Sequence, residues 1–278
     1  MRTDTDIFNI GRFGWPPDVH LCTDLSATSW LNDARLWSSS TGHSFIGELI
    51  PHNYARYVRV NHPAWKDPGN LPNEHVMWDQ HQRSLQPVSW AEVARWSGRS
   101  LGDALIFDDV LPERKTMTKP PFDGEPQNLS PVILSQLIPA LRSLTTTPHK
   151  IWMGFCDTTG EWDNCGIADV HDDSTRPDIW ERRQLRQQFC HEIAQLPRWA
   201  PPRWVATGRS YWLGEGPLDS VYDISRGIYD VEPFLWWPND HAWLISHDID
   251  LDFSLIGTTE KGLNGILGLP YVEAYEVW

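Results

Sequence analysis

One stretch near the end of the chain, residues 234–257, constrains the fold more than any other. It reads FLWWPNDHAWLISHDIDLDFSLIG and holds three tryptophans, two histidines and four aspartates. Apolar and acidic side chains alternate through its second half, and a period of two is typical of a strand with one buried and one wet face. The stretch therefore predicts one or two strands of a sheet that is exposed on one side.

The aspartates of this stretch raise the question of a metal site. Their spacing matches the first three ligands of an EF-hand loop, which also needs glycine at position six and glutamate at position twelve. Those positions hold Phe253 and Thr259, which excludes an EF-hand. Alternation instead places Asp248, Asp250 and Asp252 on the wet face of a strand. There they are either solvated or share a hard cation such as Mg²⁺ or Ca²⁺.

Nearby side chains extend this candidate site. Asp240, His241 and His247 are close enough in sequence to complete a metal site, and one of the carboxylates could equally act as a general base. Asp240 and His241 are also expected, together with the neighbouring tryptophans, in a site that binds a ligand or partner. The rings of Trp236, Trp237 and Trp243 offer a second possibility, a stacking surface for a carbohydrate or peptide. That hypothesis predicts that some of the three rings face solvent, whereas core filling predicts that they are buried.

The charge of the chain is acidic and uneven. The net charge is −14, of which residues 1–150 carry −2 and residues 151–278 carry −12. Phosphate affinity comes largely from Lys and Arg, so the acidic half argues against a nucleic-acid partner. The same charge suits a basic partner or a cation, although acidic surfaces also keep proteins soluble.

Other features bound the class of protein. Four cysteines in 278 residues do not form a disulfide scaffold, and no run of apolar residues is long enough to span a membrane. The first residues lack the apolar segment of a secretory signal. We therefore expect a cytoplasmic protein that does not associate with membranes.

Periodicity and turn residues predict an α+β protein with a mainly antiparallel sheet in its C-terminal half, packed against several helices. Capping signals stand out at Ser89 with Glu92 and Gly98, and at Ser130 with Pro131. Pro139 is expected to kink or split the second of these helices. The expected helices cover about 29–37, 43–49, 89–98, 130–141, 178–196 and 259–267. The expected strands cover about 54–60, 105–110, 151–155, 203–206, 210–213 and parts of 234–257. We expect a single integrated unit over 1–278, with a possible sub-boundary near 145–150.

No signature of a nucleotide-binding loop or a nucleophile elbow occurs in the sequence. The leading hypothesis is a non-enzymatic binding or regulatory protein without a cofactor, whose partner is an unknown protein or small ligand. The alternatives are a metal-assisted hydrolase that uses the acidic strand face, and a tryptophan-lined carbohydrate- or peptide-binding protein.

The segments WWPNDHAW (236–243) and DIDL (248–251) resemble an actinobacterial family of uncharacterised proteins that shares a WWPxDxAW…DIDL segment. The resemblance extends to Val272–Ala274 and, more weakly, to several segments in the first half. The chain departs from the pattern at His241, where arginine is expected, and in a longer insertion across 66–87. The resemblance implies one integrated bacterial protein and carries no activity, cofactor or catalytic residue.

Overall fold

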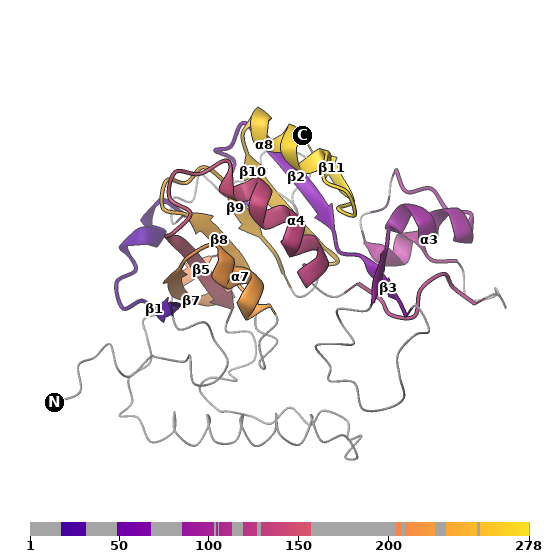
Figure 1. Ribbon diagram of the computed structural model, residues 1–278, viewed down its shortest axis with the longest axis horizontal. Coiled ribbons are helices and arrows are strands. Elements are labelled where there is room, and N and C mark those ends of the chain that lie inside the picture. The colour runs from indigo at the N-terminus through magenta and orange to yellow at the C-terminus, as the bar shows by residue number, and fades with distance from the viewer. Residues whose placement is uncertain are drawn as a thin grey trace, which may run out of the picture. The chain divides into compact units, whose positions relative to one another are not determined.

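The computed structural model confirms an α+β protein in which helices accompany antiparallel strands (Figure 1). None of its described helices is long and apolar enough to cross a membrane. The structure describes residues 18–31, 49–67, 85–102, 104, 106–112, 119–126, 129–156, 204–206, 209–225, 232–248 and 251–277.

The chain divides into two compact units, each built from two separate segments. The first unit takes residues 1–52 and 147–241, and the second takes residues 53–146 and 242–278. The predicted organisation as one integrated unit is not tested by this division and stays a prediction.

The first unit contains an antiparallel sheet with the strand order β1-β7-β5-β8, in which β6 also pairs with β7. The strands predicted at about 203–206 and 210–213 are confirmed as β6 and β7, which pair with each other. A further helix, α7, lies outside the helices that the sequence predicted. The elements are β1 (His20–Leu21), a 3₁₀ helix (Ser26–Leu31), β5 (Ile151–Cys156), β6 (Trp204–Ala206), β7 (Arg209–Gly216), α7 (Asp219–Ile224) and β8 (Leu235–Pro238).

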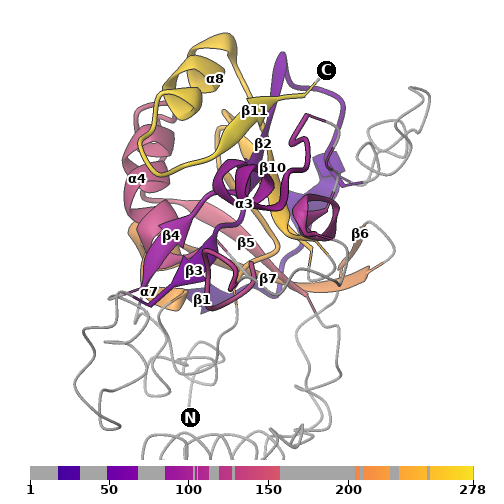
Figure 2. The ribbon, with the colours of Figure 1, turned by 90° about the vertical axis from the view of Figure 1, so that its right-hand side faces the viewer.

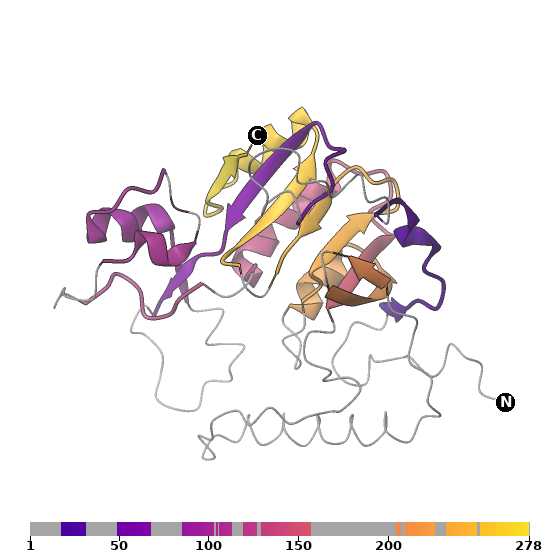
Figure 3. The same cartoon turned by 180° about the vertical axis from the view of Figure 1, so that it is seen from behind.

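The second unit contains antiparallel strands in the order β9-β10-β2-β11 and a separate pair, β3-β4. Helices α4 and α8 lie on one face of the larger sheet, as Figures 1 and 3 show from opposite sides. The elements are β2 (Arg56–Asn61), β3 (Ala64–Lys66), β4 (Gln86–Val88), α3 (Trp90–Ser97), a 3₁₀ helix (Phe107–Val110), α4 (Pro131–Arg142), β9 (Leu244–Ser246), β10 (Phe253–Thr258), α8 (Glu260–Leu267) and β11 (Ala274–Glu276).

Local signals explain where the helices of this unit begin and end. The Ser89 side chain accepts a hydrogen bond from the Glu92 backbone N–H at the start of α3, and Gly98 ends the helix with a φ of 73°, which favours glycine. Helix α4 begins at Pro131 after Ser130, as predicted, and buries its apolar stripe. It continues through Pro139, so this proline does not split the helix, and the alternative expectation of a kink stays a prediction.

Two other expectations differ from the structure, and others fall outside the described residues. The predicted strand at 105–110 is wrong, because Phe107–Val110 forms a 3₁₀ helix instead. Residues 29–31 of the first expected helix belong instead to the 3₁₀ helix Ser26–Leu31. The helix predicted at 178–196 lies outside the described residues, as do residues 32–37 and 43–48 of the two earlier ones.

The second unit has a local apolar cluster around α3, which lies beside the β3-β4 pair (Figure 2). The rings of Trp90 and Phe107 meet edge to face with centroids 5.5 Å apart, and Phe122 meets Phe107 at the same distance. Edge-to-face contacts of this kind add to the stability gained by burying the rings. The cluster holds α3 in place, and the N-terminus of that helix forms part of the site described below.

Candidate functional site

The three tryptophans of the predicted site belong to the core. Trp236 is 1% exposed, and Trp237 and Trp243 are 0% exposed. The Trp243 indole N–H donates to the Leu141 carbonyl oxygen at 3.1 Å, which satisfies the polar atom of the buried ring. None of the three rings faces solvent, contrary to what a carbohydrate or peptide stacking surface predicts.

Asp240 and His241 lie in a turn of the first unit. The Asp240 backbone N–H donates to the Thr147 hydroxyl oxygen at 3.2 Å. The His241 ring stacks on Trp30 with centroids 4.4 Å apart, and partial burial lowers the pKa of His241 although the Asp240 charge opposes this. His241 also adopts a left-handed backbone with a φ of 55°. These contacts give both residues a role in holding the turn.

Asp248 and Asp252, the two described residues of the predicted acidic face, do not lie in a strand. Asp248 and Asp252 lie between β9 and β10, where the Leu251 N–H donates to the Asp248 carbonyl at 3.0 Å. Asp248 is only 7% exposed, and the Asp252 carboxylate accepts a hydrogen bond from the Phe107 N–H at 3.0 Å. Asp250 lies outside the described residues. Across the described ranges, no group of three His, Cys, Asp or Glu side chains is placed to hold a metal ion.

Two buried histidines lie close to this segment. The His62 Nε2 atom is 2.9 Å from the Ser254 hydroxyl, and the His62 and His247 rings have centroids 4.9 Å apart. His62 and Ser254 have no exposed surface, and His247 is 5% exposed. Burial lowers the pKa of His247 to about 4, an effect that the Asp248 charge partly offsets. A serine and a histidine enclosed in this way can support the interior but cannot meet a substrate.

A pocket of about 300 Å³ opens elsewhere on the second unit. It lies where the end of β2, the end of β4, the start of α3 and the segment before β11 meet. Its described lining consists of Asn61, Pro63, Pro87, Ser89, Glu92, Tyr271, Val272 and Glu273. The pocket is therefore assembled from three parts of the chain that are far apart in sequence.

Glu273 joins two of these parts. Its carboxylate accepts hydrogen bonds from the Trp90 N–H at 2.7 Å and the Ala91 N–H at 2.9 Å. The Tyr275 hydroxyl donates to it at 2.9 Å and the Asn61 amide at 3.4 Å. A carboxylate at a helix N-terminus is stabilised by the free N–H groups and by the helix dipole. Glu273 thus caps α3 from outside the helix, and its negative charge lies at the pocket wall.

The Tyr275 hydroxyl is affected by this arrangement. Burial, the Glu273 charge and the hydrogen bond to that carboxylate all raise the pKa of Tyr275. The phenol therefore stays protonated and remains a donor to Glu273 over the physiological pH range. As a result, both oxygens of Glu273 are occupied by donors from the protein.

Arg59 is a buried residue that contacts the pocket-lining side chain of Asn61. Its side chain is 7% exposed and lies over the rings of Trp90 and Phe253, at 5.0 and 4.2 Å from their centroids. The Arg59 Nε–H donates to the Asn61 side-chain oxygen at 2.8 Å, which turns the Asn61 amide toward Glu273. The guanidinium is thus held in the interior and does not line the pocket.

The exposed part of the lining consists of Glu92 and Tyr271. Glu92 is exposed in the first turn of α3. Tyr271 is 73% exposed and has a φ of 60°, an uncommon backbone conformation for a residue with a bulky side chain. Among the described residues that line the pocket, two carry carboxylates and none carries a positive charge. The pocket is chemically suited to a cation.

The sequence singled out some residues that line this pocket but did not predict that they lie together. Ser89 and Glu92 were recognised as a helix-capping pair, and Val272–Ala274 as part of the family resemblance. No local pattern connects Glu273 with the N-terminus of α3, because the two lie 183 residues apart. No protein-family model, curated protein or solved structure matches the chain.

Proposed function

We propose that the protein is a non-enzymatic binding protein whose pocket takes a cationic group, an ammonium or guanidinium, from a small ligand or a partner. The observation that carries the proposal is the described lining, which combines the carboxylates of Glu92 and Glu273 with an exposed tyrosine ring and no positive charge. As the sequence predicts, the partner is an unknown protein or a small ligand. The predicted location is the cytoplasm.

The two carboxylates have different parts in this function. Glu92 is exposed and can accept a charge-assisted hydrogen bond from the ligand. Glu273 already accepts from four donors, so it contributes its charge to the pocket while its oxygens hold the wall together. The net charge of −14 adds a long-range attraction for cations.

Tyr271 supplies a surface for the same group. A guanidinium or ammonium is attracted to the face of an aromatic ring, by about 0.5–1 kcal/mol at exposed sites. Guanidinium is the better fit, because its planar fork both stacks on a ring and pairs with a carboxylate. We therefore expect a ligand with a guanidinium group to bind more tightly than one with a simple amine.

A hydrolytic role has weaker support. The hydrogen bond between Ser254 and His62 resembles part of a nucleophilic dyad, but both side chains have no exposed surface. A nucleophile must be reachable by the substrate carbonyl or phosphorus. The open pocket, by contrast, is accessible and has the complementary charge for a ligand.

Calorimetric titration of the full-length chain with agmatine, a butylamine that carries a guanidinium, tests the proposal. We expect saturable binding that weakens about tenfold in Glu92→Gln, a loss of about 1.4 kcal/mol. Glu260→Gln is the matched control, because Glu260 is an exposed glutamate of the same unit on α8, where it pairs with Arg56 outside the pocket lining. Absence of binding to the unmodified chain, or equal binding by Glu92→Gln, would overturn the proposal.

A further inference from the structure

Strand β11 lies at the edge of the larger sheet of the second unit. On one side it pairs with β2, in the register Ala274↔Val60 and Glu276↔Val58. The Asn61 N–H donates to the Glu273 carbonyl at 2.9 Å. The Val277 N–H donates to the Tyr57 carbonyl at 3.0 Å.

These bonds fix the direction of every backbone group in β11. In an antiparallel pair, hydrogen-bonded residues alternate with residues whose N–H and C=O point away from the partner strand. Because Glu273 and Val277 bond toward β2, Ala274 and Glu276 turn their backbone groups to the other side. In the part of the chain that the structure describes, no strand pairs with that side. An edge of this kind is a template for another strand.

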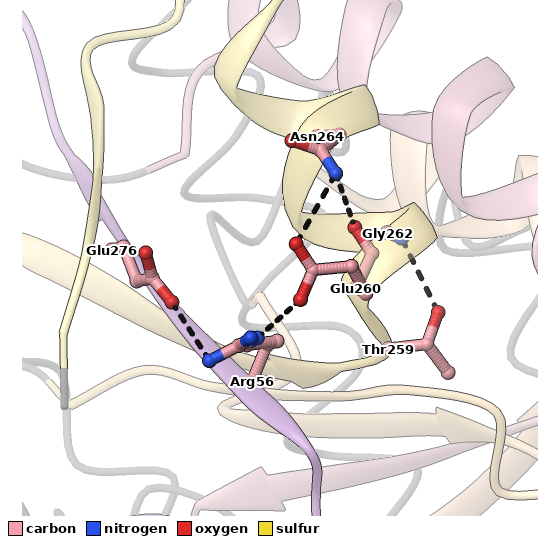
Figure 4. Close-up of polar contacts among 6 residues, drawn as sticks. All are labelled: Arg56, Thr259, Glu260, Gly262, Asn264 and Glu276. Atoms are coloured by element: carbon pink, nitrogen blue, oxygen red, sulfur yellow. Dashed lines mark hydrogen bonds and ion pairs between the residues drawn. The ribbon is translucent and has the colours of Figure 1, made fainter.

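The charges near this edge determine which kind of chain can pair with β11. Glu273 precedes the strand and Glu276 ends it, and Figure 4 shows Arg56 between Glu276 and Glu260 of α8. Arg56 offsets one of these charges and Arg59, which interacts with Glu273 from the interior, offsets another, so three glutamates face two arginines and the surroundings of the edge remain acidic. A second copy of the same edge would bring like charges together, which is unfavourable across a strand pair. A basic chain is favoured instead.

Strand β11 follows directly in sequence on residues that line the pocket. Tyr271, Val272 and Glu273 line the pocket, and Ala274 is the first residue of β11. An extended chain advances about 3.3 Å per residue, so a segment paired with β11 has the pocket within the reach of its neighbouring side chains. Strand addition with a side-chain pocket alongside is an established way for proteins to bind peptides.

We propose that the partner is an extended basic segment of another protein, which adds to β11 as a strand and places an arginine or lysine side chain in the pocket. This inference rests on the proposed function, because it assigns the source of the cationic group. The backbone hydrogen bonds provide affinity for an extended chain, and the acidic pocket provides selection for a basic side chain.

The test uses a fluorescent, end-capped peptide with one arginine among valines and threonines, and its binding is followed by anisotropy. Ala274→Pro removes an N–H that points away from β2, and an edge strand tolerates proline at such a position. Ala274→Val is the matched control, because it keeps the N–H. We expect Ala274→Pro to weaken peptide binding about tenfold and Ala274→Val to leave it unchanged, while agmatine binds both variants as it binds the unmodified chain.

A second measurement leaves the protein unaltered. Only alternate N–H groups of an added strand face β11, so methylating one alternate set of peptide nitrogens should abolish binding and methylating the other set should not. Equal effects of the two sets, or equal binding by Ala274→Pro and Ala274→Val, would overturn strand addition. Binding of agmatine without any binding of the peptide would also overturn it. Binding of neither compound would overturn the proposed function itself.

Discussion

Two aromatic-rich segments of the chain have opposite surroundings. In 234–248, Trp236, Trp237 and Trp243 are at most 1% exposed, whereas in 271–276 Tyr271 is 73% and Tyr275 38% exposed. The first segment is far more conspicuous in the sequence. In this chain the concentrated large rings lie in the core, because burial of their apolar area contributes most to stability there. The exposed rings lie in the less conspicuous segment.

The same contrast holds for two residues with a left-handed backbone. His241 has a φ of 55° and its ring stacks on Trp30, whereas Tyr271 has a φ of 60° and an exposed ring. Such a backbone costs roughly 1–2 kcal/mol in a residue other than glycine. At His241 the ring contact can offset that cost. At Tyr271 the conformation holds a ring at the mouth of a pocket, which fits a binding role.

The largest expected effect separates the buried ring from the exposed one. Trp243→Ala should lower the free energy of unfolding by about 3–5 kcal/mol, because it empties a fully buried site and removes one of the N–H donors to the Leu141 carbonyl. Tyr271→Ala should change it by less than about 0.5 kcal/mol. Urea denaturation measures both. Similar losses in the two variants would contradict the different roles assigned to the two rings.

The next largest effect on stability is expected from acid, through the buried side chain of His247. The folded-state pKa of His247 is about 4 against 6.5 for the unperturbed side chain, so the unfolded chain binds more protons between these values. This contribution to stability is complete above pH 6.5 and is lost as the pH falls toward 4, by about 3 kcal/mol in all. Denaturation at a series of pH values should show that slope, and His247→Gln should remove it. An unchanged slope in the variant would contradict the prediction.

Glu273 should be costly to remove although it lines an open pocket. Glu273→Ala deprives the Trp90 and Ala91 N–H groups of their acceptor and should lower the free energy of unfolding by about 2 kcal/mol. Glu92→Ala removes an exposed carboxylate of the same pocket and should change it by less than about 0.5 kcal/mol. Equal losses would show that Glu273 does not hold the pocket wall.

The smallest effect on stability is expected at Tyr271, with a larger one on binding. Tyr271→Gly relieves the left-handed backbone but adds freedom to the unfolded chain, so its net change should stay within about 1 kcal/mol. Loss of the ring should weaken agmatine binding about threefold to fivefold, and Tyr271→Phe should retain it. If calorimetry finds the same agmatine affinity for Tyr271→Gly and the unmodified chain, the Tyr271 ring does not take part in binding.

Local sequence signals predicted much of the fold. The serine cap and Gly98 delimit α3, the Ser130–Pro131 start delimits α4, and the alternation before Asn61 marks β2. Each signal acts within a few residues, where the physics is that of capping and alternation.

The errors arose where distant contacts decide the structure. The alternation of Asp248 and Asp252 resembles a strand, but the Asp252 carboxylate binds the Phe107 N–H, which is 145 residues away in sequence. The pocket depends in the same way on Glu273 reaching Trp90. A local pattern carries no trace of such pairs, so the candidate site could not be assembled from the sequence.

The most direct measurement is an agmatine titration of the ¹⁵N-labelled full-length chain, followed by backbone amide chemical shifts. We expect saturable shifts concentrated at Ser89, Glu92, Tyr271 and Val272, which line the pocket. Amides of the tryptophan-rich segment 234–248 should not move. Shifts centred on that segment, or no saturable shift at the pocket, would contradict a cation-binding site beside Glu273.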